Sequence, residues 1–441
     1  MQTLTAALAI CVALVSATVE AQEPYNLAAP VRNLATLFAD LYGPNGLVVD
    51  SLATLPGEQP HTAHFTSDFQ FNFSQFSTAL VAQLVSVPLP SPASGFTYRF
   101  DPSLGVFQRT TQSFGPILAE RAETIGAGRL ALGFAVQRFT FDTIEGLDLH
   151  TVPAVFTHDN AALRGGREDV VTTLNDINAS VNQSTTFLTY GVTDRFDVAV
   201  AVPVVETSLR VVSDATIHRI GTTNELTHFF RQSNGEVGDR RLFTAVGGAT
   251  GVGDVTIRFK GTLASGQSNG LAVGVDIRVP TGDAMNLLGS GTTGVQPFFI
   301  WSDTFQKLAP HLNVSYTWNG SSILAGNPAR GVSADFPDQF GYTGGADLGV
   351  TPRLTIVGDL LGRWVIDAER LRPDTFNALD GSTTFQSVTF DRGSFNTLSG
   401  ALGMKLNVVD RLIAQFNVLF GLDDRGLHDK VTPLWGIEYT F

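Results

Sequence analysis

Full charges recur on one face of alternating segments in the second two thirds of the chain. Apolar residues occupy every second position there, and glycines, hydroxyls and charges lie between them. By this parity the charges that share one face are Arg129, Arg258, Lys260, Arg278, Arg363 and Lys405, with Asp197, Asp276, Asp347, Asp359 and Glu438. Because a cation on a lipid-facing position costs about 2–4 kcal/mol at mid-bilayer, this face must be inward and either wet or paired. We interpret it as the lining of a lumen: a binding surface or transverse field in a channel, or a salt-bridge ladder that fills a closed barrel.

The sequence carries no pattern typical of a catalytic, cofactor or metal site. H-E-x-x-H does not occur, and the eight histidines are scattered. Gly266–Gly270 matches G-x-S-x-G in spacing only, because it lies at a predicted tight turn between two strands and not before a helix. The glycines of Gly289–Gly294 match a phosphate-binding fingerprint in spacing, but no helix is predicted after them. We therefore expect no enzymatic activity and no cofactor.

The elements that carry the charges are β-strands, because strict alternation is typical of strands with two different faces. Phe196, Val198 and Val200 alternate with Asp197 and Ala199, for example. Twelve strands are predicted, at 128–142, 181–192, 195–212, 251–264, 270–280, 294–304, 309–318, 341–350, 354–367, 395–407, 411–421 and 431–441. Ten or fourteen strands stay open, since residues 96–109 and 148–157 could add a hairpin.

The connections between these strands are alternately short and long. The short ones include residues 193–194 and 351–353, and the long ones include 213–250 and 368–394. Tight turns at one end and long loops at the other are typical of bacterial outer-membrane barrels, whose turns are periplasmic and whose loops are extracellular. We therefore predict an all-β fold, an antiparallel transmembrane barrel, over residues 126–441.

The composition is that expected of a protein whose outer surface faces mainly lipid. Only 16% of the 441 residues are charged, against roughly 25% in soluble proteins. The net charge of −13 argues against nucleic acid as a partner, because phosphate contacts need clustered cations. Outer-membrane lipid is the expected partner of the apolar face.

The first 125 residues do not alternate. Residues 6–15 form an apolar run followed by Val19-Glu20-Ala21, which predicts an export signal over residues 1–21. A lipoprotein modified at Cys11, the only cysteine, is the alternative. Residues 22–125 are predicted to be partly helical, at 30–42 and 67–87. We interpret this segment as a plug inside or under the barrel; a periplasmic appendage that docks a partner is the alternative.

The final strand carries its own pattern. Trp435, Ile437, Tyr439 and the terminal Phe441 alternate with smaller or polar residues. This resembles the C-terminal signature of bacterial outer-membrane barrels, which the barrel assembly machinery recognises. That machinery is therefore an expected partner.

Residues 95–148, with Val279-Pro-Thr-Gly-Asp283 and Gly289-Ser-Gly291 leading into Gln296-Pro-Phe-Phe, resemble a known family. These are the outer-membrane proteins grouped as "meta-pathway of phenol degradation", distantly related to long-chain fatty acid and aromatic hydrocarbon transporters. The resemblance covers about residues 95–441 and implies uptake of hydrophobic or aromatic small molecules. The N-terminal segment is longer than the hatch of the fatty acid transporters, and their Asn-Pro-Ala-Gly motif has no convincing counterpart before the barrel. No binding residues are carried over.

We therefore expect an outer-membrane channel that passes small hydrophobic or aromatic solutes by passive diffusion. The alternative is a surface protein without transport activity, whose long extracellular loops bind a partner.

Overall fold

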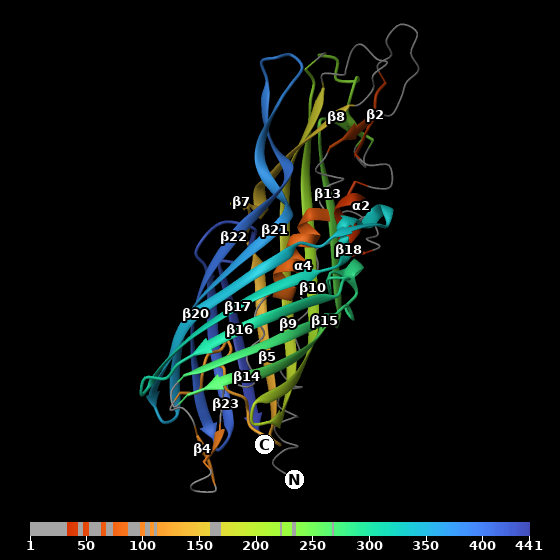
Figure 1. The fold of residues 1–441 in the computed structure, drawn as a ribbon. Coiled ribbons are helices and arrows are strands. Elements are labelled where there is room, and N and C mark those ends of the chain that lie inside the picture. The colour runs from red at the N-terminus through yellow and green to blue at the C-terminus, as the bar shows by residue number, and fades with distance from the viewer. Residues whose placement is uncertain are drawn as a thin grey trace.

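The computed structural model of the protein describes residues 33–42, 47–52, 63–67, 74–86, 98–101, 106–109, 113–158, 169–220, 223–231, 235–266 and 269–441. Within them, twelve antiparallel strands close into a barrel, which confirms the predicted fold class (Figure 1). They are β5 (Leu130–Phe141), β9 (Val170–Thr193), β10 (Phe196–His218), β14 (Val255–Ser265), β15 (Gly270–Val279), β16 (Gly294–Ser302), β17 (Leu308–Asn319), β20 (Asp338–Thr351), β21 (Leu354–Asn377), β22 (Thr384–Val409), β23 (Leu412–Gly421) and β25 (Val431–Thr440). The barrel closes where β25 pairs with β5, and the Phe441 N–H donates to the Leu130 carbonyl at 2.7 Å.

The outer face of the wall near its tight turns is apolar. In the register of the sheet, Leu188, Val200, Ile257, Ile277 and Val295 stand beside one another on five successive strands. None of them is buried by protein, so this row faces the surrounding solvent. An apolar belt on a closed barrel is the surface that lipid covers.

Several wall strands continue further from the tight turns than the sequence predicted. β9 begins at Val170 rather than at residue 181, and β10 runs to His218 rather than to 212. β21 and β22 likewise extend into residues 368–394, which were predicted as a loop. Along these extensions the polar residues lie on the outer face and the apolar residues on the inner face, the reverse of the arrangement near the tight turns. In β10, Glu206 and Arg210 are outside, and Leu209 and Val211 are inside. The prediction of long loops was wrong there because strands were recognised by an apolar outer face, which these extensions lack.

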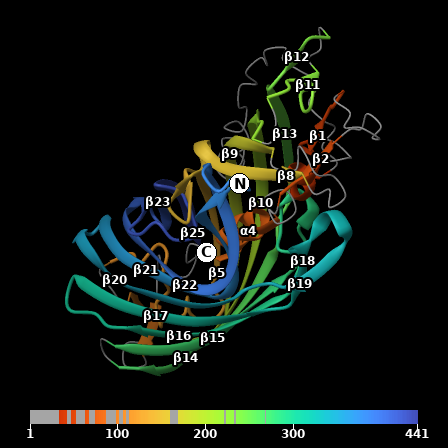
Figure 2. The same cartoon turned by 90° about the horizontal axis from the view of Figure 1, so that it is seen from above.

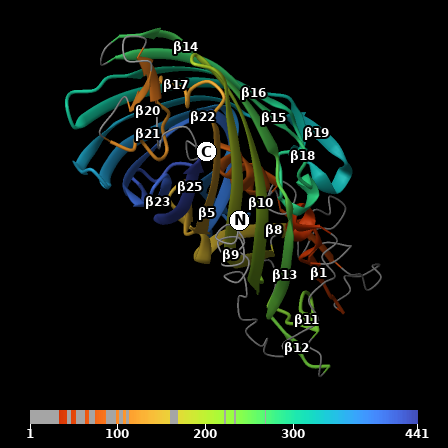
Figure 3. The ribbon, with the colours of Figure 1, turned by 90° about the horizontal axis from the view of Figure 1, so that it is seen from below.

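The predicted strand at 251–264 corresponds to β14, and a further strand, β13 (Arg240–Val252), lies mostly in residues 213–250, which were predicted as a loop. β13 pairs only with β10 among the described residues, whereas β14 pairs with β10 and β15. β13 follows β10 away from β15 and β16 (Figures 2 and 3). The wall therefore has an unpaired edge above Gly253, and the connection after β15 folds against it, with η3 (Ala284–Asn286) in its middle.

The remaining elements are short and lie mostly around the end with the long connections. They are β1 (Leu47–Val49), β2 (Ala63–Thr66), β6 (Thr143–Ile144), β7 (Leu147–Asp148), β8 (Val152–His158), β11 (Phe230–Arg231), β12 (Val237–Gly238), β18 (Ser321–Asn327), β19 (Val332–Asp335), β24 (Leu427–His428), η2 (Leu149–Thr151) and η4 (Pro328–Arg330). β8 pairs with β9 and β2 and does not close the wall, so the hairpin that could have added strands to the barrel is absent from it. β3 (Tyr98–Asp101) and β4 (Val106–Arg109) pair with each other at the tight-turn end (Figure 1).

The described parts of the N-terminal segment reach the end with the long connections. η1 (Leu34–Thr36), α2 (Leu37–Asp40) and α4 (Ser74–Ser86) lie within or at the edge of the two predicted helical ranges. No helix among the described residues is long and apolar enough to cross a bilayer. The predicted export signal, residues 1–21, lies outside the described residues.

An apolar cluster fills the barrel extension between this segment and the inner faces of β9, β10 and β13. Tyr42 packs edge-on against Phe156 and Phe243, with ring centroids 5.2 and 5.0 Å away. Its hydroxyl bonds to Ser213 at 3.0 Å, and burial raises the pKa of Tyr42 to about 12. The N-terminal residues thus supply one side of a packed core.

Candidate functional site in the barrel lumen

Residues 113–127, here called the strap, cross the inside of the barrel near its tight turns. The strap is held through its backbone: the N–H groups of Phe114, Ala122 and Ile125 donate to the side chains of wall residues. The acceptors are Thr355 Oγ1 at 2.9 Å, Ser302 Oγ at 3.1 Å and Asp197 Oδ2 at 3.1 Å, on three separate strands. A segment without repeating structure is thereby fixed across the lumen, because its backbone donors are satisfied by the wall.

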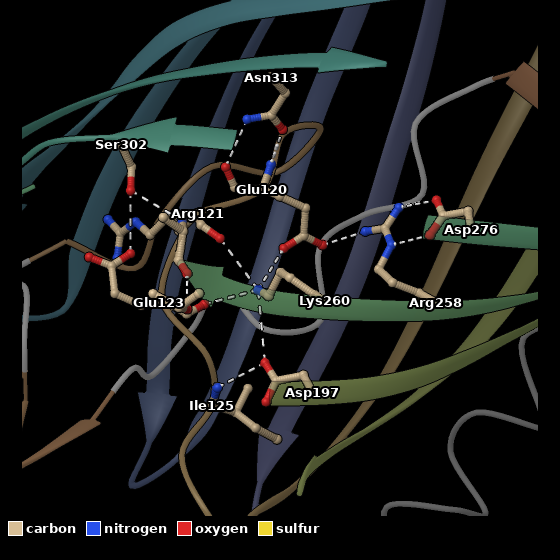
Figure 4. A network of polar contacts seen from close by, with 12 residues as sticks. Glu120, Arg121, Glu123, Ile125, Asp197, Arg258, Lys260, Asp276, Ser302 and Asn313 are labelled. Atoms are coloured by element: carbon tan, nitrogen blue, oxygen red, sulfur yellow. Dashed lines mark hydrogen bonds and ion pairs between the residues drawn. The ribbon is translucent and has the colours of Figure 1, made fainter. Parts of the chain in front are cut away.

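Glu120 of the strap is the centre of a buried ion cluster (Figure 4). Its carboxylate binds Arg258 at 2.5 Å and Lys260 at 3.2 Å, both on β14. Arg258 also binds Asp276 of β15 through two bonds of 2.7 and 2.6 Å. Two charges predicted from strand parity, Arg258 and Lys260, therefore meet at one carboxylate that the sequence analysis did not select, and a third, Asp276, joins them through Arg258.

Lys260 connects the cluster to the strap backbone and to a third strand. Its ammonium donates to the Glu123 carbonyl at 2.9 Å and lies 3.9 Å from the Asp197 carboxylate on β10. Lys260 and Asp197 are each only 2% exposed. At that burial an ion is tolerated only with close partners of opposite charge, so the strap and the wall stabilise each other.

A second cluster ties the strap to another part of the wall, formed by β17, β20 and β21. Arg121 binds Asp347 of β20 at 2.6 Å, and His311 of β17 lies between Asp347 and Asp359. His311 Nε2 is 2.7 Å from Asp359, and Nδ1 is 3.6 Å from Asp347. These side chains are at most 3% exposed. The sequence analysis treated His311 as one of several scattered histidines and missed its position between two carboxylates.

The other predicted lumen residues lie in three places. Arg278 donates to Asn319 Oδ1 at 2.5 Å and lies 3.7 Å from Asp254. Arg363 donates to Gln83 of α4 at 3.0 Å. Lys405 donates to the Phe114 carbonyl at 3.3 Å.

Glu438 is 5% exposed on the inward side of β25, and Arg129 is partly buried just before β5. The structure thus brings most of the eleven predicted residues into contact with the strap, α4 or one another; their role in solute passage stays a prediction. The strap partners Glu120 and Arg121 lie in a stretch without periodicity, so no parity argument could have found them.

A cavity of about 220 Å³, here called the chamber, lies between the strap and α4. Leu118 and Glu120 of the strap line one end of it, and Val81 and Gln83 of α4 line another part. The wall contributes mainly amides, hydroxyls and apolar groups, among them Gln183, Phe139, Gln296, Ser315, Thr343 and Leu361. Arg258 and Asp276, which pair with each other, also line the chamber, as do Arg278 and Arg363, so its surface combines apolar, neutral polar and charged groups.

The four residues of the predicted assembly signal lie on the outer face. Trp435, Ile437, Tyr439 and Phe441 are 58%, 40%, 37% and 46% exposed. Trp435 packs on Phe416 with centroids 4.3 Å apart, and Tyr439 packs on Phe441 at 4.8 Å. They form part of the apolar belt, and recognition by the assembly machinery stays a prediction.

Comparison with known proteins confirms the predicted family resemblance. The family model described as "Putative MetA-pathway of phenol degradation" matches residues 159–333. The match includes the motifs at Val279–Asp283 and Gly289–Gly291 but not residues 95–148. No curated protein matches the chain.

Solved structures similar to the chain include channels and a transporter, by their titles. An outer membrane channel from Pseudomonas putida F1 has 14% identity and a TM-score of 0.46, with 73% of this chain and 99% of that chain covered. The CymD monoaromatic hydrocarbon channel has 11% identity and a TM-score of 0.36, covering 81% and 98%. The Ralstonia pickettii toluene transporter TbuX has 11% identity and a TM-score of 0.34, covering 81% and 100%. The chain is a closed antiparallel β-barrel that resembles bacterial outer-membrane channels.

Proposed function

We propose that the protein is a channel through which small aromatic or other hydrophobic solutes cross the outer membrane by passive diffusion. The observation that carries this proposal is the chamber of about 220 Å³ that the strap, α4 and the barrel wall line. A cavity of about 150 Å³ already accommodates benzene, so the chamber has room for a single substituted ring.

The strap is the proposed seal at the periplasmic end. Opening it would separate Glu120 from Arg258 and Lys260, and Arg121 from Asp347. Breaking one buried pair typically costs about 3–5 kcal/mol, and the strap makes several, so we propose that it stays in place while solutes pass.

The proposed exit from the chamber is the break in the wall at Gly253. Asp254, Leu288 and Gly289 line the chamber beside this break, and β13 lacks a strand partner there among the described residues. Asp254 holds the adjoining connection by accepting from Gly282 N–H at 3.1 Å and from Ser290 N–H and Oγ at 2.7 and 2.6 Å. A few neutral donors are easier to release than the ion pairs of the strap.

The uptake proposal is tested in whole cells, because lipopolysaccharide makes the outer membrane a barrier to apolar solutes. A strain that lacks the gene is compared with the same strain expressing the wild-type chain, with radiolabelled toluene as the probe. We expect faster initial uptake with the protein, linear in toluene concentration and insensitive to a protonophore. Equal uptake in the two strains would refute transport and leave the barrel as an anchor for surface loops.

A further inference from the structure

Two exposed arginines on the outer wall have no partner among the described residues. Arg138 of β5 and Arg210 of β10 point outward, because the residues on either side of each are buried. Neither side chain makes an ion pair or a hydrogen bond within the part of the chain that the structure describes. Arg240 of the neighbouring β13, which is also exposed, is instead paired with Asp214. Arg138 and Arg210 are therefore available to a partner outside the chain.

Both arginines lie just beyond the apolar belt. On β10 the outward residues from Phe196 to Val204 are all apolar, and they span roughly 26 Å along the strand at about 3.3 Å per residue. The apolar band of an outer-membrane barrel is about 25 Å tall. On β5 the outward residue changes from Val136 to Arg138 at the same level, because Val136 and Val204 pair with the same residue of β9. Arg138 is thus placed at the outer edge of the belt, and Arg210 lies further out.

A row of hydroxyls lies between the two arginines. Thr140, Ser180 and Ser208 stand beside one another on β5, β9 and β10, and their side chains face outward. In the register, Arg210 lies two strands across and four residues along from Arg138. This offset places their α-carbons roughly 16 Å apart, at about 4.8 Å per strand and about 3.3 Å per residue. A single lipid headgroup with two anionic groups can therefore contact both arginines and the hydroxyls between them.

Glu206, the acidic residue in these rows, does not neutralise the arginines. Its carboxylate accepts from Asn182 Nδ2 at 3.1 Å, and no ion pair joins it to Arg138 or Arg210 within the described residues. Guanidinium groups bind phosphate through two parallel N–H donors, and hydroxyls also donate to phosphate oxygens. This surface therefore fits a phosphorylated headgroup whose acyl chains lie on the belt beside it.

We propose that this outer face of β5, β9 and β10, here called the headgroup surface, binds the two phosphates of lipid A, the anchor of lipopolysaccharide, through Arg138 and Arg210. Two cations this far apart favour a headgroup that carries two phosphates over a phospholipid that carries one. The headgroup surface also lies toward the long connections, which are extracellular in barrels of this kind. The proposal goes beyond solute transport and does not depend on it.

The experiment measures binding of fluorescently labelled diphosphoryl lipid A to the purified full chain in a non-ionic detergent, with a chelator present to remove divalent cations. We expect Arg138→Gln and Arg210→Gln each to weaken binding about five-fold, and the double variant about twenty-five-fold, as cations beside an anionic lipid surface imply. Arg240→Gln is the matched control, because it removes the same charge from an exposed arginine that is already paired. It should change the affinity by less than about two-fold.

Two further probes identify the source of the phosphate. Monophosphoryl lipid A should bind the wild type about five-fold more weakly than the diphosphoryl form, and unlabelled phosphatidylglycerol should displace the label only at a concentration about ten times that of unlabelled diphosphoryl lipid A. Equal binding of the two forms of lipid A, or equal displacement by phosphatidylglycerol, would overturn the assignment to lipopolysaccharide. Undiminished binding by the double variant would overturn the headgroup surface itself.

Heat-modifiable migration on a gel reports whether each variant has folded. If the double glutamine variant does not fold, threonine at both positions replaces it, since threonine already occupies the same outer face at Thr140. The binding assay contains no solute, so a failure of toluene uptake in cells would refute the transport proposal and leave this result unaffected.

Discussion

The two halves of the barrel use the same strands with opposite chemistry. Near the tight turns, β10 places Phe196, Val198 and Val200 outside and Asp197 inside. Beyond Val204 the same alternation places polar groups outside and Leu209 and Val211 inside. The first half has an apolar surface outside and ions within, whereas the second has a polar surface outside and a packed apolar core within.

The difference shows how each half is filled. In the membrane half, the lumen is crossed by the strap, whose contacts to the wall are ion pairs and backbone hydrogen bonds. In the extracellular half, the N-terminal helices pack apolar side chains such as Leu37 and Phe38 into the cluster. One chain segment therefore plugs one half by charge and the other by hydrophobic burial, with the chamber between them.

The largest loss of stability is expected from removing a cation of the buried ion cluster. Lys260→Met removes the cation that lies beside both Glu120 and Asp197, leaving buried carboxylates with fewer partners. We expect the free energy of unfolding to fall by about 3–5 kcal/mol, and the ion conductance of single barrels in planar bilayers to rise.

Lys307→Met is the control, because Lys307 is exposed in a tight turn. Its effect on the free energy of unfolding should stay within about 0.5 kcal/mol. Both values are obtained by urea titration of folded protein in lipid vesicles. A Lys260→Met barrel as stable and as poorly conducting as the wild type would mean that the strap is not held by these ions.

A smaller change in stability is expected from substitutions that locate the boundary between the two halves. Val200→Arg places a cation in the middle of the apolar belt and should destabilise the barrel by about 2–4 kcal/mol. Ser208→Arg places the same side chain on the same face of β10 beyond the exchange, between Glu206 and Arg210, and should change stability by no more than about 0.5 kcal/mol. Equal effects of the two substitutions in the same urea titration would contradict the assignment of Val200 to lipid and Ser208 to water.

Sequence alone predicted the membrane half well. Alternation around Val198 and Val200 has a strong apolar face, and all twelve strands that the alternation predicted are present in the barrel. The extracellular half was missed because residues such as Asp214 and Thr216 made its outer face look like a loop. In this part of β10 the apolar residues that indicate a strand, Ala215 and Ile217, lie on the inner face. The alternation could have been recognised only by allowing for a polar outer face beyond the apolar belt.

The lumen was predicted in part for a similar reason. Strand parity placed Arg258, Lys260 and Asp197 on one face, but their partners Glu120 and Arg121 are more than 70 residues away in an aperiodic stretch.

The central claim is that the strap is a static seal and that solutes use the chamber above it. The β-carbon of Ala122 lies 2.8 Å from the position that a β-carbon would take at Gly270. A disulfide needs about 3.5–4.5 Å between these atoms, so the double variant Ala122→Cys with Gly270→Cys can cross-link strap and wall after a shift of about 1 Å. We predict that toluene uptake by cells with the oxidised variant equals uptake after reduction. Uptake that is blocked by oxidation and restored by a reductant would contradict the account, because the strap would then have to move for every solute that passes.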